Sequence, residues 1–271
     1  VVGYTKKDLD NWTEIMARVI CAAGANADDI VQIAFGYGLF TGGFGLHYGM
    51  EKIGAMVVPL SSGNTERQIM LMQDFGSTVL IATPSYALYL AEEMAKRGID
   101  KDTIKLRLAL FGGEGHTEEM RAKIESQLGI LATENYGLSE VGGPGFSGEC
   151  YLKNGLHIAE DQFISEVIDP DTLQPLPIGD KGELVITTLT KEAFPMLRYR
   201  TRDITWLMDE PCACGRTSMR MKKVQGRTDD MMVIRGVNVF PSQIESVIMA
   251  MHEIEPFYEI IVTTEEYLDR I

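Results

Sequence analysis

The chain of 271 residues carries 39 acidic and 25 basic residues, which gives a formal net charge of −14, and 45% of its residues are hydrophobic. That hydrophobic share is typical of a globular chain and excludes general disorder. So large an acidic excess repels a phosphate backbone and excludes nucleic-acid binding as the main role. Because no apolar run approaches the roughly 18 residues of a membrane-spanning helix, we expect no membrane partner. Four cysteines are too few for a disulfide framework, so we expect a reducing, cytoplasmic setting.

The first half of the chain alternates helix-like and strand-like segments. A helix should begin at Thr5, which forms a capping pair with Asp8, and end at Gly24. Apolar runs predict buried strands at 30–35, 56–59, 78–82 and 106–111, and apolar periodicity predicts helices near 44–54, 65–75, 84–97 and 117–128. This alternation predicts an α/β fold whose parallel sheet is flanked by helices. Ligands bind beyond the carboxyl ends of such strands, which directs attention to the loops after Phe35, Phe111 and Thr133.

The pattern changes twice in the second half. From about residue 155, short β-rich runs at 163–168, 183–189 and 204–208 are separated by turns. After 226–230 we expect a strand at 231–234, a helix from Pro241 and a strand at 260–262. We therefore predict part of a large domain over 1–228, with a β-rich subdomain from about 155, and the start of a truncated, small α+β C-terminal domain over 229–271.

The segment 134–140 places an aromatic ring, a glycine, a hydroxyl and a carboxylate close together. Tyr136 and Asn135 offer a flat face and an amide of the kind that an adenine ring needs. Ser139 and Glu140 offer a hydroxyl donor and a carboxylate for a divalent cation beside a triphosphate. A polar loop with a capping serine explains the same residues equally well.

Two further segments allow two interpretations each. Asp203 could accept the two hydroxyls of a ribose, or could simply pair with Arg200 and Arg202. The segment 226–230 could supply a hinge carboxylate and a ligand-facing arginine, or could be a solvated turn.

Taken together and in order, these segments resemble the adenylate-forming (AMP-binding) superfamily of acyl-CoA synthetases, and within it the phenylacetate–CoA ligase branch. The resemblance covers nearly all of the chain. Members of the family join a carboxylic acid to ATP as an acyl adenylate, release pyrophosphate, and pass the acyl group to the thiol of coenzyme A. The resemblance therefore implies an acid–thiol ligase for an aryl acid, phenylacetate first, in aromatic acid catabolism. It is carried by Phe35-Gly36-Tyr37 within 35–43, Ser62-Gly63-Asn64 within 62–68, Tyr136-Gly137-Leu138-Ser139-Glu140, Tyr199-Arg200-Thr201-Arg202-Asp203 within 197–203, and Gly226-Arg227-Thr228-Asp229-Asp230 followed by 235–241.

The resemblance also implies roles for individual residues. Tyr136 matches the residue that stacks on adenine, and Ser139 and Glu140 match the contact to the α-phosphate and the magnesium ligand. Asp203 matches the carboxylate that binds the ribose, Arg227 a second nucleotide contact, and Asp229 the hinge of the small domain. The residues placed around the base are Gly112, Gly113, Glu114, Glu134 and Asn135, and those placed around the aryl acid are Tyr37, Phe40, Gly43, Gly112, Gly113 and Pro144.

Two parts of the family pattern fall outside these 271 residues. The phosphate loop would precede residue 1, and the lysine that promotes adenylation would follow residue 271, so we expect residues 1–271 alone to bind nucleotide weakly and to be inactive. The alternative function is a non-catalytic adenine-nucleotide-binding regulatory module. Transfer to a carrier-protein thiol is disfavoured by the aryl-acid motifs. The sequence leaves open which aryl acid is used and the oligomeric state, a homodimer among the alternatives.

The cysteines suggest a second site. Cys150, His157, Cys212 and Cys214 provide three thiols and an imidazole, the donor set of a structural zinc ion. Four unrelated reduced residues are the alternative. We expect Cys21 to lie in the core, and His116 to be an exposed loop residue.

Overall fold

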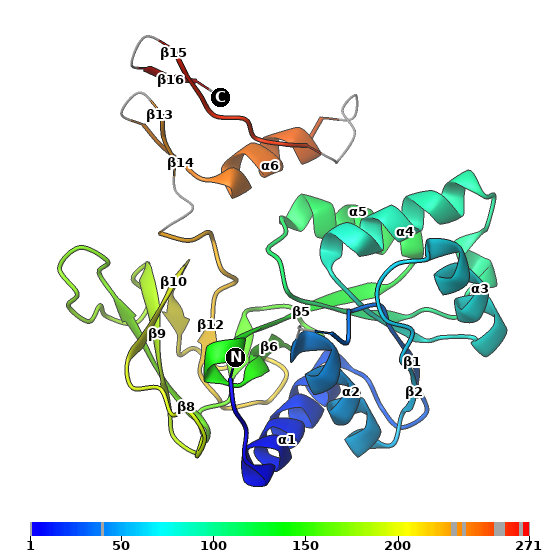
Figure 1. Ribbon diagram of the computed structural model, residues 1–271, viewed down its shortest axis with the longest axis horizontal. Coiled ribbons are helices and arrows are strands. Elements are labelled where there is room, and N and C mark those ends of the chain that lie inside the picture. The colour runs from blue at the N-terminus through cyan, green and yellow to red at the C-terminus, as the bar shows by residue number, and fades with distance from the viewer. Residues whose placement is uncertain are drawn as a thin grey trace.

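The computed structural model describes residues 2–38, 41–228, 232–234, 237–251, 258–265 and 268–270. Its centre is a nine-stranded mixed sheet in the order β11-β12-β7-β6-β5-β4-β3-β1-β2 (Figure 1). The parallel half confirms the predicted sheet. Its strands are β1 (Ile30–Ile33), β2 (Met56–Val58), β3 (Val79–Ala82), β4 (Leu108–Phe111) and β5 (Leu131–Leu138).

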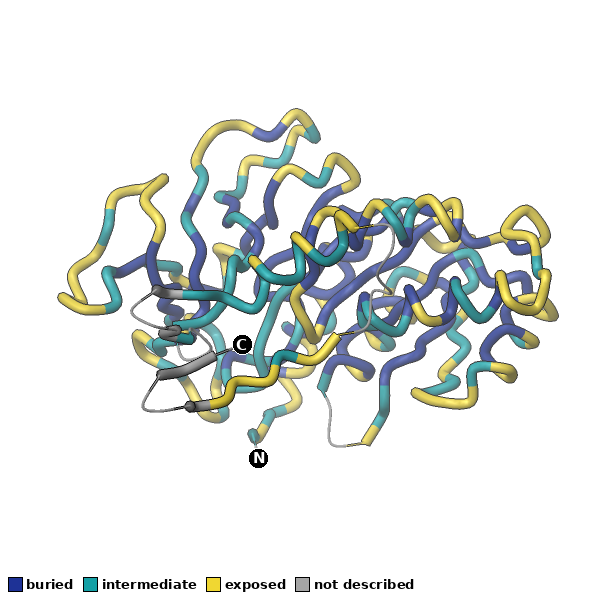
Figure 2. Tube along the Cα trace, turned by 90° about the horizontal axis from the view of Figure 1, so that it is seen from above, coloured by how far each residue is buried: buried dark blue, intermediate teal, exposed yellow. Residues whose placement is uncertain are grey.

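Helices cover both faces of the parallel half, as the alternation predicted. On β3, Val79 and Ile81 pack with α1 (Lys6–Ala23) and α2 (Thr41–Ile53). The alternate residues Leu80 and Ala82 pack against the other face, because successive strand side chains point to opposite sides. The helices on that second face are α3 (Thr65–Phe75), α4 (Pro84–Lys96) and α5 (Glu118–Leu128). In Figure 2 the buried chain, in dark blue, runs mainly through the interior, and the exposed chain, in yellow, lies mainly at the outer turns.

The ends of α1 are fixed by its sequence. The Thr5 side chain accepts a hydrogen bond from the backbone N–H of Asp8, and the Asp8 carboxylate accepts one from the backbone N–H of Thr5. Gly24 ends the helix in the left-handed region with φ of 107°, a conformation that glycine adopts without strain. Both predicted boundaries are therefore confirmed.

The other half of the large sheet is antiparallel and was predicted only in part. β5 pairs in parallel with β4 on one side and antiparallel with β6 (Gly143–Glu149) on the other. β6 contains three glycines and a proline, a composition that hides a strand from sequence reading. The remaining strands are β7 (Leu156–Ile158), β12 (Arg220–Met221) and β11 (Leu207–Met208), and a separate sheet holds β8 (Phe163–Ile168), β9 (Gly182–Thr188) and β10 (Tyr199–Thr205). Two 3-10 turns, Lys101–Thr103 and Ser139–Val141 (η2), complete the large unit.

The described residues of the C-terminal segment form two antiparallel strand pairs and one helix. These are β13 (Met232–Ile234), β14 (Val237–Val239), α6 (Pro241–Met249), β15 (Thr263–Glu265) and β16 (Leu268–Arg270). The strand predicted at 260–262 is wrong: these residues are irregular, and β15 begins at Thr263. Ile261 is 62% exposed and Val262 44%, so this apolar run does not enter a core. None of the helices in the described ranges is long and apolar enough to cross a bilayer.

The antiparallel half is tied to α5 by a buried ion pair between Arg121 and Glu149, each 3% exposed. Glu149 accepts hydrogen bonds at 2.7 and 3.1 Å from the guanidinium of Arg121, and a third from the backbone N–H of Glu134. Removing one member of such a pair leaves a buried charge without its partner.

We therefore expect Glu149→Ala to lower the free energy of unfolding by about 3–5 kcal/mol, as measured by urea denaturation. The matched control is Asp161→Ala, which breaks the exposed pair between Arg18 and Asp161 at 3.0 Å. Exposed pairs contribute less than about 1 kcal/mol. Equal losses in the two variants would contradict this account of the Arg121–Glu149 pair.

Candidate active site

The candidate site lies where β4 and β5 end and β6 begins. Two glycines let backbone segments approach closely there. A Cβ on Gly112 would lie 3.0 Å from the carbonyl oxygen of Asn135, and a Cβ on Gly137 would lie 2.1 Å from that of Gly143. The Asn135 side-chain amide donates to the carbonyl oxygen of Phe111 at 2.7 Å. The ends of β4, β5 and β6 therefore form one compact edge.

A cavity of about 510 Å³ opens at this edge, and we call it the larger cavity. Seven of the nine residues predicted to bind nucleotide line it. Pro241, Ser242 and Glu245 of α6 line it as well, and the sequence offered no sign of this contribution. The seven are Gly113, Glu114, Glu134, Asn135, Tyr136, Asp203 and Arg227. The Glu114 carboxylate also accepts a hydrogen bond from the Ser85 backbone N–H at 2.7 Å, at the start of α4.

Tyr136, Asp203 and Arg227 contact one another on one side of the larger cavity. The Tyr136 hydroxyl donates to one carboxylate oxygen of Asp203, and Arg227 donates to the other at 3.1 Å. Asp203 and Arg227 are also joined by a β-bridge. Burial, together with the Asp203 charge, raises the pKa of Tyr136 well above its usual range. The structure therefore brings together three residues that lie as much as 91 positions apart in the sequence (227 − 136).

A buried polar cluster forms the back of the larger cavity. His116 was expected to be exposed, and this was wrong: it is 6% exposed and packs edge-on against Phe111. Its Nε2 lies 4.0 Å from Glu134 Oε2, and Lys223 Nζ lies 3.5 Å from the same oxygen. Burial, then the charges of Lys223 and Arg121, lower the pKa of His116 to about 2, so its imidazole is neutral near pH 7. His116 lines the larger cavity and was missed by sequence reasoning, since it stands in no recognisable motif, and Lys223 contacts this site through Glu134.

A second cavity of about 210 Å³, the smaller cavity, adjoins the first. The two share Gly113, Asn135, Gly137 and Leu138 as lining residues. Two predicted nucleotide contacts, Gly112 and Ser139, line the smaller cavity rather than the larger one. Ser139 bonds the hydroxyl of Thr41 at 3.1 Å. Two ligand groups could thus meet at the shared glycine edge.

Of the residues predicted to contact the aryl acid, some line the smaller cavity, whereas Tyr37 and Gly43 are not among its lining residues. Pro144, Gly112 and Gly113 line the smaller cavity. Tyr37 bonds His47 Nδ1 at 3.0 Å and packs edge-on against Phe44, and a Cβ on Gly43 would lie 3.0 Å from the Gly36 carbonyl oxygen. Phe40 lies outside the described residues, as does the predicted hinge residue Asp229. Glu140 follows Ser139 in η2 and is partly buried, and its role as a magnesium ligand stays a prediction.

The four residues of the predicted zinc site form one cluster, and one of them, Cys150, directly follows the last residue of β6. Their ligand atoms all lie within 4.8 Å of one another, at Cys150, His157, Cys212 and Cys214. Burial, then Arg216 and Arg220, lower the pKa of His157 to about 4, which leaves a neutral imidazole able to bind a metal. Cys21, expected in the core, is exposed and lies outside the cluster, because it falls on the solvent side of α1.

Comparison with known proteins identifies the class. The sequence model of the AMP-binding enzyme family matches residues 10–190, and that of the AMP-binding enzyme C-terminal domain matches residues 236–271. The chain belongs to the AMP-binding enzyme family.

Among its curated relatives are two phenylacetate-coenzyme A ligases. The protein from Thermus thermophilus is 54% identical over 99% of this chain, and the protein from Escherichia coli is 48% identical over the whole chain. The chain spans 61% and 62% of their respective lengths.

Solved structures agree with this fold. A 2-hydroxyisobutyryl-CoA ligase in the postadenylation state, in complex with R3-HIB-AMP, superposes with a TM-score of 0.88 at 26% identity over 93% of this chain and 54% of its own. The same enzyme with 2-HIB-AMP and CoA in the thioesterification state gives a TM-score of 0.81 over 99% of this chain and 58% of its own. The predicted adenylate-forming α/β fold is thereby confirmed.

The buried carboxylate of Glu134 should make the stability of the protein depend on pH. Burial raises its pKa from 4.5 to about 7, although Lys223 opposes the rise. Between pH 4.5 and pH 7, Glu134 keeps its proton in the folded state and releases it in the unfolded state. The free energy of unfolding therefore falls as the pH rises through this range. Glu134→Gln should therefore gain stability relative to the wild type between pH 5 and pH 8, by up to about 3 kcal/mol at about 1.4 kcal/mol per pKa unit.

Urea denaturation at several pH values measures this difference. Glu118→Gln is the control with the opposite sign. Burial raises the pKa of Glu118, but the charges of Arg121 and Lys223 outweigh burial and lower it. Its ionised form therefore adds stability above its usual pKa, and the variant should lose stability relative to the wild type as the pH rises through the acid range. A pH-independent difference for Glu134→Gln would contradict the assignment.

Proposed function

We propose that the full-length protein is an AMP-forming aryl-acid CoA ligase that acts on phenylacetate or a closely related acid. The observation that carries the proposal is the pair of adjoining cavities that share Gly113, Asn135, Gly137 and Leu138. An enzyme that joins an acid to a nucleotide needs two binding spaces that meet at the reacting atoms. The relatives named phenylacetate-coenzyme A ligase, at 48–54% identity, support the choice of acid.

The larger cavity is the proposed site for the adenosine part of ATP. Tyr136 offers a ring on which adenine can stack, and Asn135 and the backbone at Gly113 lie at the edge of that space. Asp203, already held by Arg227, offers carboxylate oxygens to the ribose hydroxyls. Its bond from Tyr136 ties the base site to the ribose site, so the two contacts are preorganised together.

The smaller cavity is the proposed site for the acid. Five of its lining residues are glycines, at which the flat face of an aromatic ring can approach the backbone, and Phe35 and Leu138 add apolar contacts. The acid carboxylate would point towards the shared edge, where an α-phosphate held near Ser139 would meet it. Glu140 would hold Mg²⁺, which neutralises phosphate charge when it is bound.

In the first half-reaction, a carboxylate oxygen forms a bond to the α-phosphorus while the bond to pyrophosphate breaks. In the second, the thiolate of coenzyme A attacks the acyl carbon and AMP leaves. The residues described here bind and orient the reactants, and effective molarity gained by such positioning accounts for much of the barrier reduction in two-substrate reactions. Asp229 stays the proposed hinge for the change between the two steps.

We also propose that the Cys150–His157–Cys212–Cys214 cluster holds a structural zinc ion. Two sulfurs bound to one tetrahedral zinc at 2.3 Å lie about 3.8 Å apart, and Cys150 Sγ lies 3.9 Å from Cys212 Sγ. Cys214 Sγ lies 3.4 Å from His157 Nε2, also compatible with a shared metal. The ion would join the turn after β6 to the 212–214 loop beside Ala22 of α1. It lies outside both cavities, so its role would be stability.

The test of the function is pyrophosphate exchange into ATP by the full-length protein in the presence of a panel of aryl acids. Exchange that depends on phenylacetate supports the ligase. Nucleotide binding without exchange for any acid supports the regulatory module instead.

Asp203→Ala should raise the Kd for ATP of the full-length protein at least tenfold. Two ribose hydroxyls lose a charged acceptor, and hydrogen bonds to charged groups contribute roughly 1.5–3 kcal/mol each. Isothermal titration calorimetry measures the change. Asp169→Ala is the control, because the described contacts of that carboxylate are with its own turn, at Asp171 and Thr172. An unchanged Kd in Asp203→Ala would remove Asp203 from the nucleotide site.

Metal analysis of protein purified without chelator should find about one zinc per chain. Cys212→Ser should lose the metal and lower the melting temperature, while the Kd for ATP stays within about threefold of the wild-type value, because a structural zinc contributes folding free energy. Cys21→Ser, which removes the exposed thiol outside the cluster, should keep both metal and stability. Metal-free wild-type protein of full stability would refute the zinc site.

A further inference from the structure

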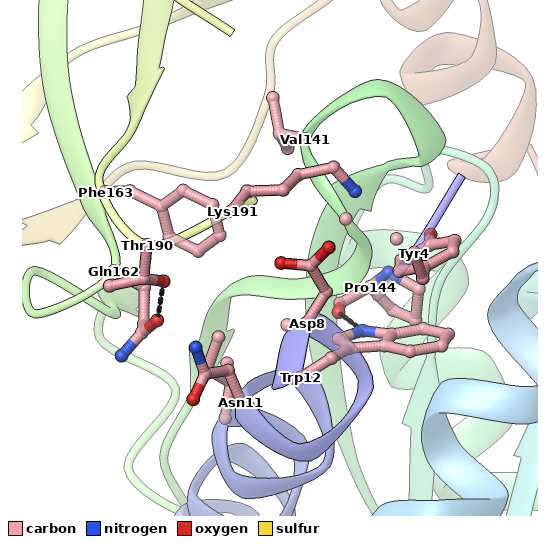
Figure 3. A pocket seen from close by; sticks show the side chains of 14 residues that line it. Tyr4, Asp8, Asn11, Trp12, Val141, Pro144, Gln162, Phe163, Thr190 and Lys191 are labelled. Atoms are coloured by element: carbon pink, nitrogen blue, oxygen red, sulfur yellow. Dashed lines mark hydrogen bonds between the residues drawn. The ribbon is translucent and has the colours of Figure 1, made fainter. Parts of the chain in front are cut away.

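Behind the smaller cavity lies a stack of side chains that neither the motifs nor the family comparison explains. Trp12 of α1 is 6% exposed, and the ring of Tyr4 stacks on its indole with centroids 5.5 Å apart and planes at 19°. Lys191 Nζ lies 4.1 Å from the centre of the Tyr4 ring. Figure 3 shows this arrangement, with the Lys191 side chain reaching across to Tyr4 and Trp12 beside Pro144.

Trp12 holds the wall of the smaller cavity in two ways. Its indole N–H donates to the Pro144 carbonyl oxygen at 2.8 Å, the bond drawn dashed in Figure 3. Its ring also fills the space over Gly143, where a Cβ would lie 2.7 Å from Cζ2. Gly143 has φ of +96°, a left-handed conformation that favours glycine. The Trp12 indole therefore fixes both the position and the backbone conformation of the Gly143–Pro144 segment.

The same indole contacts α2. A Cβ on Gly45 would lie 2.4 Å from Trp12 Cζ2 and 3.0 Å from Pro144 Cγ. Thr41 and Gly42, one turn earlier on α2, line the smaller cavity. Trp12 thus fixes the spacing between α2 and the start of β6, two of the elements that enclose the cavity.

Gly143 and Pro144 form a partition. They line the smaller cavity on one side and, on the other, the space that holds Tyr4, Trp12 and Lys191. The outer side is closed by a loop that Asp8 holds in place, since its carboxylate accepts from the backbone N–H groups of Glu192 at 2.7 Å and Ala193 at 3.0 Å. Trp12 is therefore packed against the Tyr4 side of the partition and hydrogen-bonded to the partition itself.

We propose that Trp12 is a positioning residue for the acid substrate, acting through the Gly143–Pro144 partition. The inference rests on the proposed function, because it takes the smaller cavity as the acid site. Trp12 does not itself line that cavity. It acts by fixing where the Pro144 backbone lies, and loss of its N–H leaves a partly buried carbonyl oxygen without this donor, which allows the partition to shift.

Trp12→Phe in the full-length protein tests the role of the N–H. We expect the KM for phenylacetate in pyrophosphate exchange to rise about threefold to tenfold, the effect of one lost hydrogen bond, while the KM for ATP stays within twofold. Trp206→Phe, which changes the only other tryptophan of the chain, should leave both values unchanged. A purely structural role for Trp12 would lower the active fraction and leave both KM values as they are.

A spectroscopic measurement keeps the test decisive if Trp12→Phe does not fold. In Trp206→Phe, Trp12 is the only tryptophan of residues 1–271. Saturation with phenylacetate should then change its emission, because the partition separates ligand from indole by one layer of backbone. In the full-length protein, any further tryptophan is also replaced by phenylalanine.

The outcomes separate the two proposals. Active wild-type protein whose acid KM is unchanged in a folded Trp12→Phe variant overturns the role of Trp12 and leaves the ligase standing. If Trp12→Phe does not fold, the Trp206→Phe variant decides. Trp12 emission that does not change at saturating phenylacetate also overturns the role of Trp12. Wild-type protein that supports no exchange with any aryl acid overturns the proposed function itself, and the assignment of Trp12 with it.

Discussion

The close approach of β5 and β6 at Gly137 is the constraint on which the site depends. No side chain fits there, since a Cβ would lie 2.1 Å from the Gly143 carbonyl oxygen. The approach pairs Gly137 and Leu138 of β5 with Pro144 and Gly143 at the start of β6, where the Trp12 indole bonds Pro144. Both cavities open along this junction and share Gly137. A parallel sheet that continues as an antiparallel one thus creates the edge at which two ligands can meet.

Behind that edge, buried charges are arranged in pairs and not as isolated groups. Arg121 and Glu149 bond each other, and Glu149 also accepts from the backbone of Glu134. Lys223 faces Glu134 from the segment that leads towards the C-terminal unit. Separating these pairs would leave buried charges unpaired, which is costly. The network therefore holds the back of the larger cavity against α5 and the 222–228 segment. Arg227 then continues the same segment to Asp203.

The parts of the fold that depend on local pattern were predictable. Apolar runs predicted four of the five parallel strands, β1 to β4, and Thr5, Asp8 and Gly24 predicted both ends of α1, because capping and periodicity act within a few residues. The strand at 260–262 failed for the converse reason. An apolar run predicts a strand only if another surface covers it, and Ile261 and Val262 remain exposed. β6 was missed because its glycines serve close packing against α1 and β5, which no local pattern records.

By itself the sequence determined the class of fold, the order of its motifs, and the residue types able to contact a nucleotide, since each of these is written in local runs of residues. The tertiary structure alone decided that Tyr136 and Arg227 both bond Asp203. It also decided that the ligand atoms of three cysteines and one histidine lie within 4.8 Å of one another, and that His116 is buried beside Glu134. It further decided that Trp12 bonds the carbonyl oxygen of Pro144, which lies 132 positions further along the chain and lines the smaller cavity. The physical reason is that these contacts join segments far apart in the chain, and their geometry follows from how the sheet and helices pack.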